Sequence, residues 1–281
     1  MNIFYVDGSY LPEDRAVVSV SDLGLLRGYG VFDFLRTYSR RPFLLEDHVA
    51  RLAQSARIID LSLPLSESDI MDIAMETLER NNGLTEANIR LVLTGGDSAD
   101  SITPEDRTRL LVMVNGLHTC PEQWYRDGAA VITTRHERYL PRAKTTNYLP
   151  AVLALSQARQ EGAMESIYVA PDGRLLEGTT ANFFAFIDGA LTTPGDGVLP
   201  GITRKVILQL ADGRFAVDIR DIHREEIQNM EEAFITASNK EVVPVVRVDE
   251  HSIGSGRPGE RTRRIMQLFS DYTHRYGQDG R

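Results

Sequence analysis

The spacing of apolar residues changes near residue 46, and this change constrains the fold of the chain more than any other feature. Before it, short apolar runs at residues 3–6 and 31–38 have the length and turn boundaries of strands. A mixture of strand and helix patterns predicts an α+β fold. After residue 46, apolar residues recur on one helix face, at Val49, Leu52, Ala53, Ala56 and Ile59.

Turn and cap residues complete the expected first half. Asp7-Gly8 follows the first strand and predicts a hairpin to residues 16–20. A second helix is expected over residues 67–81, because Asn82-Gly83 provides a C-cap signal. Two further strands are expected at residues 89–94 and 110–114.

Residues 116–128 show little periodicity and predict a linker between two α+β domains. The N-terminal domain, residues 1–115, is expected to be the smaller one, and residues 129–281 form the larger domain. A binding site between the two halves is the default expectation. In the second half we expect strands near residues 130–133, 166–169, 182–187 and 233–236, helices near 150–160 and 203–210, and a last helix with one apolar stripe.

Composition excludes several classes of function. The net charge of −9 over 281 residues leaves no basic surface suited to a nucleic acid backbone. The only cysteine, Cys120, excludes an internal disulfide and a cysteine-rich metal site. No apolar stretch approaches the roughly 18 residues of a membrane span, and the first residues lack a secretory pattern. We therefore expect a cytoplasmic protein without a membrane segment.

Lys144 is the best candidate for a reactive lysine. The chain has three lysines, and Lys144 is the one in a turn context, between small and hydroxyl residues and four positions before Tyr148. A lysine that loses its proton can act as an amine nucleophile or form a Schiff base. A single loop lysine is more often only solvated, so the pattern alone leaves both readings open.

Other segments combine polar groups with turn residues, and each also has an ordinary structural explanation. Glu177 precedes a run of small residues before a strand, where an acid commonly serves as a turn or cap residue. Residues 199–204 open a helix, and residues 234–244 contain a turn rich in hydroxyl groups. Both could bind an anion or could simply cap local structure. Arg51 lies opposite the apolar stripe of its helix, so periodicity predicts a surface arginine. No histidine has a partner at zinc-ligand spacing, so no metal is expected.

In their order along the chain, these segments resemble the class IV aminotransferases, the fold-type IV family of pyridoxal-phosphate (PLP) enzymes. The resemblance covers nearly the whole chain. It implies a two-domain α+β fold, with PLP between the domains and a site completed by the partner subunit of a homodimer. The matching motifs are His-Val-Ala-Arg-Leu at 48–52, Lys144 with Tyr148, Leu-Glu-Gly-Thr-Thr-Ala-Asn-Phe-Phe at 176–184, Leu-Pro-Gly-Ile-Thr-Arg at 199–204 and Thr-Ala-Ser-Asn at 236–239.

The resemblance also implies a role for each matching residue. Lys144 would form the Schiff base and carry out the proton transfer, and Glu177 would face the pyridine nitrogen and keep it protonated. Tyr148 would bind the ring 3-oxygen, and Leu199 would pack on the ring face. The phosphate would be held by Arg51, which would then face the cofactor instead of solvent, together with Ile202, Thr203, Ala237 and Ser238.

The substrate is less clear from the sequence, because the residues typical of two branches are absent. L-branched-chain enzymes typically have His-Tyr-Gly and Tyr-Ile-Arg at two positions of this pattern. This chain has Leu26-Arg27-Gly28 and Asn88-Ile89-Arg90 there. The Arg-x-His pair of the usual D-amino-acid aminotransferases is also absent, and Phe32 replaces their tyrosine. Residues 21–33 resemble instead a less typical group of D-amino-acid aminotransferases.

We therefore expect a transaminase that moves the amino group of a D-amino acid to a 2-oxo acid in ping-pong half-reactions. Arg27 and Arg90 would bind the substrate α-carboxylate, because a buried charge needs a partner and arginine meets a carboxylate with two hydrogen bonds. Phe32 and Asn239 would also line the substrate pocket. An L-branched-chain aminotransferase and a lyase of the aminodeoxychorismate type that releases pyruvate remain alternatives. A non-catalytic family member is disfavoured because Lys144, Glu177 and Arg51 are all present.

Overall fold

The computed structural model describes residues 1–279, which divide into two compact units. Unit 1 contains Met1–His118, Arg142–Tyr148 and the end of the last helix from His274. Unit 2 contains Thr119–Pro141 and Leu149–Thr273. Residues 142–148 and the end of the last helix are expected in the C-terminal domain, whereas both belong to unit 1, and backbone hydrogen bonds join residues 144–146 to β3 (Gly30–Tyr38).

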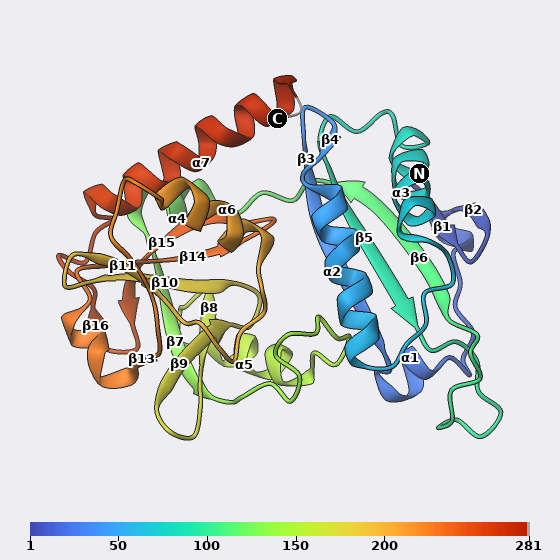
Figure 1. Ribbon diagram of the computed structural model, residues 1–281, viewed down its shortest axis with the longest axis horizontal. Coiled ribbons are helices and arrows are strands. Elements are labelled where there is room, and N and C mark those ends of the chain that lie inside the picture. The colour runs from blue at the N-terminus through green and yellow to red at the C-terminus, as the bar shows by residue number, and fades with distance from the viewer. Residues whose placement is uncertain (280–281) are drawn as a thin grey trace. The chain divides into compact units, whose positions relative to one another are not determined.

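Unit 1 is built on a six-stranded antiparallel sheet with the order β2-β1-β6-β5-β3-β4 (Figure 1). Helices α2 (Leu45–Ile58) and α3 (Glu67–Glu79) pack on one face of the sheet, where Leu52 and Leu78 join a core of buried strand residues. The two helices expected in this half and the strands expected near residues 3–6, 31–38, 89–94 and 110–114 are thus confirmed. The strands are β1 (Ile3–Val6), β2 (Ser9–Pro12), β3 (Gly30–Tyr38), β4 (Arg41–Pro42), β5 (Ala87–Thr94) and β6 (Arg109–Gly116).

The hairpin predicted to residues 16–20 is wrong. Asp7 and Gly8 both have positive φ angles, 46° and 96°, and such a two-residue turn pairs β1 with the residues that follow immediately. β1 therefore pairs with β2, a short 3-10 helix (Glu13–Arg15) follows, and residues 16–20 form no strand. Val17 is 74% exposed, so its apolar side chain contributes nothing to the core.

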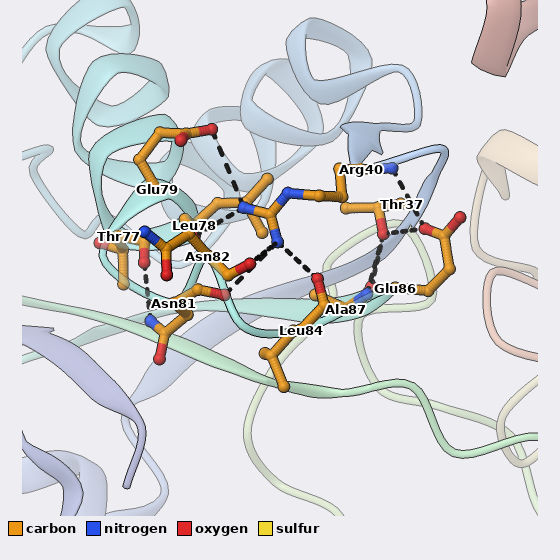
Figure 2. A network of polar contacts seen from close by, with 10 residues as sticks. All are labelled: Thr37, Arg40, Thr77, Leu78, Glu79, Asn81, Asn82, Leu84, Glu86 and Ala87. Atoms are coloured by element: carbon orange, nitrogen blue, oxygen red, sulfur yellow. Dashed lines mark hydrogen bonds and ion pairs between the residues drawn. The ribbon is translucent and has the colours of Figure 1, made fainter.

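The expected second helix also ends earlier than its predicted cap. α3 ends at Glu79 with Arg80 as the C-cap, and Asn82-Gly83 lies beyond it in a turn. The free backbone carbonyls at the end of α3 find a hydrogen-bond donor in another element (Figure 2). This donor is the guanidinium of Arg40, which lies in the β3–β4 turn. The accepting carbonyls are those of Leu78, Asn81, Asn82 and Leu84.

Unit 2 contains a ten-stranded mixed sheet in which β12-β11-β10-β14-β15-β7-β8-β9-β13 follow one another and β16 pairs with β15. Every strand and helix expected in this half is confirmed, and α4 (Glu122–Asp127) lies within the segment expected to be a linker. The strands are β7 (Ala129–Arg135), β8 (Glu165–Val169), β9 (Arg174–Gly178), β10 (Asn182–Ile187), β11 (Ala190–Thr193), β12 (Val217–Ile219), β13 (Ile222–His223), β14 (Glu232–Ala237), β15 (Glu241–Val248) and β16 (His251–Ser252). The helices are α5 (Leu149–Gln160), α6 (Ile202–Ala211), the 3-10 helix Arg224–Asn229 and α7 (Glu260–Asp279).

Buried strands form the core of unit 2, and all six residues of β10 are buried. Phe183 on β10 and Ile235 on β14 meet in this core, and α7 places Ile265 and Phe269 on its buried stripe. In residues 1–279, no helix is both long and apolar enough to cross a membrane.

Candidate active site

The segment that carries Lys144 lies along the first half of β3. The Phe32 N–H donates to the Lys144 carbonyl at 2.9 Å, and the Thr146 N–H donates to the Gly30 carbonyl at 2.9 Å. The Lys144 N–H donates to the Ser55 hydroxyl on α2 at 3.1 Å. These bonds fix the backbone of Lys144 against both the sheet and the helix.

Phe32 brings three candidate side chains of unit 1 together. The Lys144 Nζ lies 4.7 Å from the centre of the Phe32 ring, and the Tyr148 ring meets it edge-on with centroids 5.3 Å apart. Arg90, on β5, places its guanidinium carbon 5.4 Å from the same ring and 5.1 Å from the Phe34 ring. Lys144, Tyr148 and Arg90 therefore gather around one aromatic side chain.

The register of the sheet explains why Arg90 faces these rings. Arg90 pairs with Phe34 across the strands, whereas its neighbours Ile89 and Leu91 point to the other face and are fully buried. Within residues 1–279, Arg90 forms no ion pair with a carboxylate. Burial lowers the pKa of the Arg90 guanidinium and the Tyr148 phenol opposes this shift, but an arginine stays charged at neutral pH.

Arg51 belongs to a buried cluster with Asp33 and His48. The Arg51 Nε and Nη2 donate to the two oxygens of Asp33, each at 2.8 Å, and Asp33 Oδ1 lies 2.6 Å from His48 Nδ1. Only 9% of the Arg51 side chain is exposed, so the surface position predicted from periodicity is wrong. The physical reason is the buried carboxylate on β3, which the spacing of α2 cannot reveal.

Burial and neighbouring charges shift the pKa values of this cluster in opposing directions. Burial alone would raise the pKa of the Asp33 carboxyl, but Arg51 and His48 outweigh burial and hold this pKa well below its usual range. Burial lowers the pKa of His48, against the opposing effect of Asp33. The Nδ1 of His48 faces Asp33, and its buried Nε2 has no hydrogen-bond partner among the described residues.

Arg27 ends a short helix whose other end is anchored firmly. Asp22, fully buried, caps α1 (Leu23–Arg27) by accepting from the Gly24 N–H at 2.7 Å. Arg27 is exposed and donates to the carbonyl of its neighbour Leu26. Among the described residues it contacts none of the side chains around Phe32, so the structure does not join Arg27 to Arg90.

Glu177 in unit 2 is a buried carboxylate that accepts from a guanidinium, a backbone N–H and an amide. Its Oε1 accepts from the Arg138 guanidinium at 2.9 Å. Its Oε2 accepts from the Leu199 backbone N–H at 3.0 Å and from the Asn182 amide at 3.3 Å. An ionised carboxylate satisfies all of these donors, so the site holds a fixed negative group.

Asn182 connects Glu177 to the start of α6. Its amide also donates to the Leu199 carbonyl at 2.9 Å. A Cβ added to Gly201 would lie only 1.9 Å from Asn182 Oδ1. Gly201 is thus the residue that lets α6 begin so close to Asn182. No side chain caps α6, so the first-turn N–H groups near the buried Ile202 and Thr203 can meet an anion.

The β14–β15 turn lies beside the same residues. Asn182 pairs directly with Thr236 in the sheet, Ala237 ends β14, and Ser238 and Asn239 follow in the turn. The Thr236 hydroxyl is buried and has no partner among residues 1–279. Unit 2 therefore assembles the predicted residues Glu177, Leu199, Ile202, Thr203, Ala237 and Ser238 around Asn182 and Thr236.

Sequence reasoning missed Asp33 and Arg138. A charged residue inside the apolar run of β3 signals a buried partner, so Asp33 could have been found from the pattern. Arg138 gives no such signal, because it lies 39 residues from Glu177 in an irregular segment. No group of three or more His, Cys, Asp or Glu residues in the described chain could hold a metal ion.

Comparisons with known proteins agree with this geometry. Residues 30–248 match the family model described as amino-transferase class IV. A Methanocaldococcus jannaschii protein, provisionally described as a branched-chain-amino-acid aminotransferase, is 34% identical over 97% of both chains. The D-alanine aminotransferase of Staphylococcus haemolyticus is 28% identical over 97% of this chain and 98% of its own. A branched-chain amino acid aminotransferase from T.th., solved with N-(5'-phosphopyridoxyl)-L-glutamate, is 26% identical with a TM-score of 0.90, covering 97% of this chain and 94% of that one.

Proposed function

We infer that this chain, which belongs to the class IV aminotransferases, transfers the amino group of a D-amino acid to a 2-oxo acid. It is a PLP-dependent enzyme, as the members of this family are. When bound, PLP supplies an aldehyde that accepts the amino group and a ring that withdraws electrons from the substrate Cα.

Residues of unit 2 fit the ring and phosphate of PLP. Glu177 would face the pyridine nitrogen, hold its proton and so maintain the electron-withdrawing form of the ring. The unpartnered Thr236 hydroxyl and the uncapped first turn of α6 are polar groups that suit a phosphate. Ile202, Thr203, Ala237 and Ser238 would donate to the phosphate, and Leu199 would pack on the ring.

Residues of unit 1 fit the reactive end of the site. Lys144 would join the cofactor through Nζ and then move a proton between the substrate Cα and C4′. Lys240 is a poor substitute because its Nζ is ion-paired with the buried Glu165 at 2.9 Å. Tyr148 would donate to the ring 3-oxygen. Arg51, whose guanidinium is oriented by two hydrogen bonds to Asp33, would bind the phosphate.

The observation that carries the assignment of an amino-acid substrate, of either configuration, is the environment of Arg90. Its guanidinium lies beside Phe32, the ring that Lys144 also contacts, and within residues 1–279 it has no carboxylate partner. A substrate α-carboxylate would supply the missing partner with two hydrogen bonds. Arg27, exposed at the end of α1, would provide a second cation, and Phe32 and Asn239 would complete the substrate pocket.

Stereochemistry is tested by comparing substrates on the purified PLP-loaded enzyme. We expect faster turnover of D-alanine or D-glutamate than of L-leucine or L-valine, with a 2-oxo acid as acceptor. The relatives named for branched-chain substrates favour the second candidate, an L-branched-chain aminotransferase, and faster turnover of the L-amino acids would support it. Pyruvate release from an aminodeoxychorismate-type substrate without an added acceptor would instead indicate a lyase.

We further propose that the enzyme is a cytoplasmic homodimer. Unit 1 exposes Val17, Val20 and Leu25 at 74%, 78% and 66%, and α5 in unit 2 exposes Val152 and Leu153 at 59% and 62%. Clusters of exposed apolar side chains commonly mark protein interfaces. Light scattering should give twice the chain mass, and full activity of a monomer would contradict this proposal.

A further inference from the structure

A second buried ion pair in unit 2 joins residues that the proposed reaction does not use. The Lys240 Nζ lies 2.9 Å from Glu165 Oε2, and the two side chains are 12% and 0% exposed. Glu165 begins β8, whereas Lys240 lies in the β14–β15 turn, 75 residues later. A buried charged pair costs desolvation energy, so it calls for an explanation of what it holds in place.

Glu165 holds the turn that follows Glu177. Its oxygens accept hydrogen bonds from the hydroxyls of Thr179 and Thr180, the latter at 2.6 Å. This turn is closed by the Gly178 N–H, which donates to the Ala181 carbonyl at 2.7 Å. The packing is tight, since a Cβ on Gly178 would lie 3.1 Å from Glu165 Cγ. The position of the β9–β10 turn is therefore set by the Glu165 carboxylate.

Lys240 holds the other turn by its backbone and side chain together. Its carbonyl accepts from the Tyr125 hydroxyl of α4 at 3.1 Å, and its N–H donates to the Ala237 carbonyl at 3.1 Å. Its Nζ reaches both Glu165 and the Thr180 hydroxyl. One side chain thus ties the turn containing Ser238 to the turn that follows Glu177.

We propose that Glu165 and Lys240 are a positioning pair that fixes the spacing of two turns of unit 2, the β9–β10 turn next to Glu177 and the β14–β15 turn that contains Ser238. The proposal rests on the proposed function, in which Glu177 meets the pyridine nitrogen and Ala237 and Ser238 meet the phosphate. PLP is a rigid ring with groups at both ends, so binding both ends at once requires the two turns to keep a set separation. Loss of the pair should therefore weaken PLP binding beyond any general loss of stability.

The experiment compares the double variant Glu165→Gln, Lys240→Met with a matched ion-pair control. The double change removes both charges together and keeps an acceptor for the two threonines, so that no unpaired charge is left buried. Arg220→Met is the control, because Arg220 pairs with Glu226 at 2.8 Å in unit 2 and is placed in no cofactor contact. The readouts are the PLP dissociation constant, the ³¹P chemical shift of bound PLP, and thermal unfolding of the PLP-free proteins.

We expect the double variant to raise the PLP dissociation constant at least tenfold and to shift the ³¹P signal, whereas Arg220→Met changes neither. A dissociation constant within twofold of the unmodified enzyme would overturn the inference. Should the double variant fail to fold, Lys240→Arg keeps the charge but changes its reach, and an unchanged dissociation constant in that variant would overturn the inference equally. Borohydride mapping of the unmodified enzyme checks the proposed function separately, because absence of label on Lys144 would remove the site on which the pair acts.

Discussion

Strand β3 contacts similar residue types in opposite situations along its length: at its far end, around Thr37 and Tyr38, and along its first half, residues 30–34, which we call its near end. At its far end, Arg40 and Glu86 are satisfied within the fold: the Arg40 guanidinium donates to backbone carbonyls at and after the end of α3, and Glu86 accepts from the Thr37 hydroxyl and the Arg40 N–H (Figure 2). At its near end, Arg90 faces aromatic rings without a carboxylate among the described residues, and His48 keeps a buried unpartnered Nε2.

This difference distinguishes an arginine that stabilises the fold from one that is a candidate for binding a ligand. Both ends place charged side chains against the same strand, so residue type alone does not distinguish them. What differs is the set of acceptors: backbone carbonyls already occupy Arg40, whereas Arg90 has a positive charge that no acid of the described residues neutralises. Arg90 is exposed in the single chain, so water can also meet its donors. The unpartnered Nε2 of His48, in contrast, is buried, and unused hydrogen-bonding capacity in a buried site points to a ligand.

The largest effect is expected from the lysine at the near end. Lys144→Ala should reduce transamination by about three orders of magnitude or more, because no other described lysine replaces its attachment and proton-transfer roles. Steady-state kinetics with saturating PLP measure this loss. Arg40→Ala serves as the far-end comparison, and we expect it to keep most of the activity.

Arg40→Ala should act on stability. Several helix-end carbonyls would lose a charged donor, and we expect the free energy of unfolding to fall by about 1.5–3 kcal/mol. Urea denaturation of the purified protein would measure the change. An unfolding curve identical to that of the unmodified enzyme would contradict the structural role assigned to the far end.

Arg90→Ala and Arg27→Ala should act on substrate binding. Each is expected to raise KM for a D-amino acid by one to two orders of magnitude, the effect of losing a charged hydrogen bond of about 1.5–3 kcal/mol. Denaturation curves of both variants should match the unmodified enzyme. If KM were unchanged while stability fell, the two ends of β3 would not differ in the way proposed.

Glu177→Gln tests the corresponding group of unit 2. The amide keeps the size of the side chain and can still accept from Leu199, so PLP should remain bound. Without the carboxylate the ring nitrogen loses its proton more readily, and transamination should slow at least tenfold, about 1.4 kcal/mol of barrier. An unchanged rate would show that another group maintains ring protonation.

The smallest effect concerns acid stability. The Asp33 carboxyl has a lower pKa in the folded protein than its ordinary value of 3.8, so its contribution is complete above that pH and is lost as the pH falls towards the folded pKa. The unmodified protein should therefore lose stability below about pH 4 more steeply than Asp33→Asn does. Thermal unfolding of both proteins is measured between pH 2 and pH 6. If Asp33 were not responsible, the unfolding temperature of the two proteins would fall equally steeply with decreasing pH.

Local patterns predicted the elements of both units but not their long-range polar contacts. Apolar spacing located α2 and β3, because burial of one face governs that spacing directly. It misjudged Arg51, whose position depends on Asp33, 18 residues earlier on another element. The hairpin after Asp7 was misplaced because turn geometry, which the apolar pattern does not describe, selects the partner strand.

The candidate site was predictable to the extent that short motifs encode it. The resemblance singled out Lys144 and Glu177, and the structure shows the contacts of each. It did not indicate the Arg138–Glu177 ion pair or the environment of Arg90, because both arise from packing between segments far apart in the sequence. Such contacts need the tertiary structure.

The central claim is that Lys144 is the lysine that holds PLP, and borohydride reduction followed by peptide mapping tests it most directly. The chain has only three lysines, Lys144, Lys205 and Lys240, so each possible site of attachment gives a distinct peptide. The account predicts the pyridoxyl group on Lys144 alone. A pyridoxyl group on Lys205 or Lys240, with Lys144 unmodified, would contradict it.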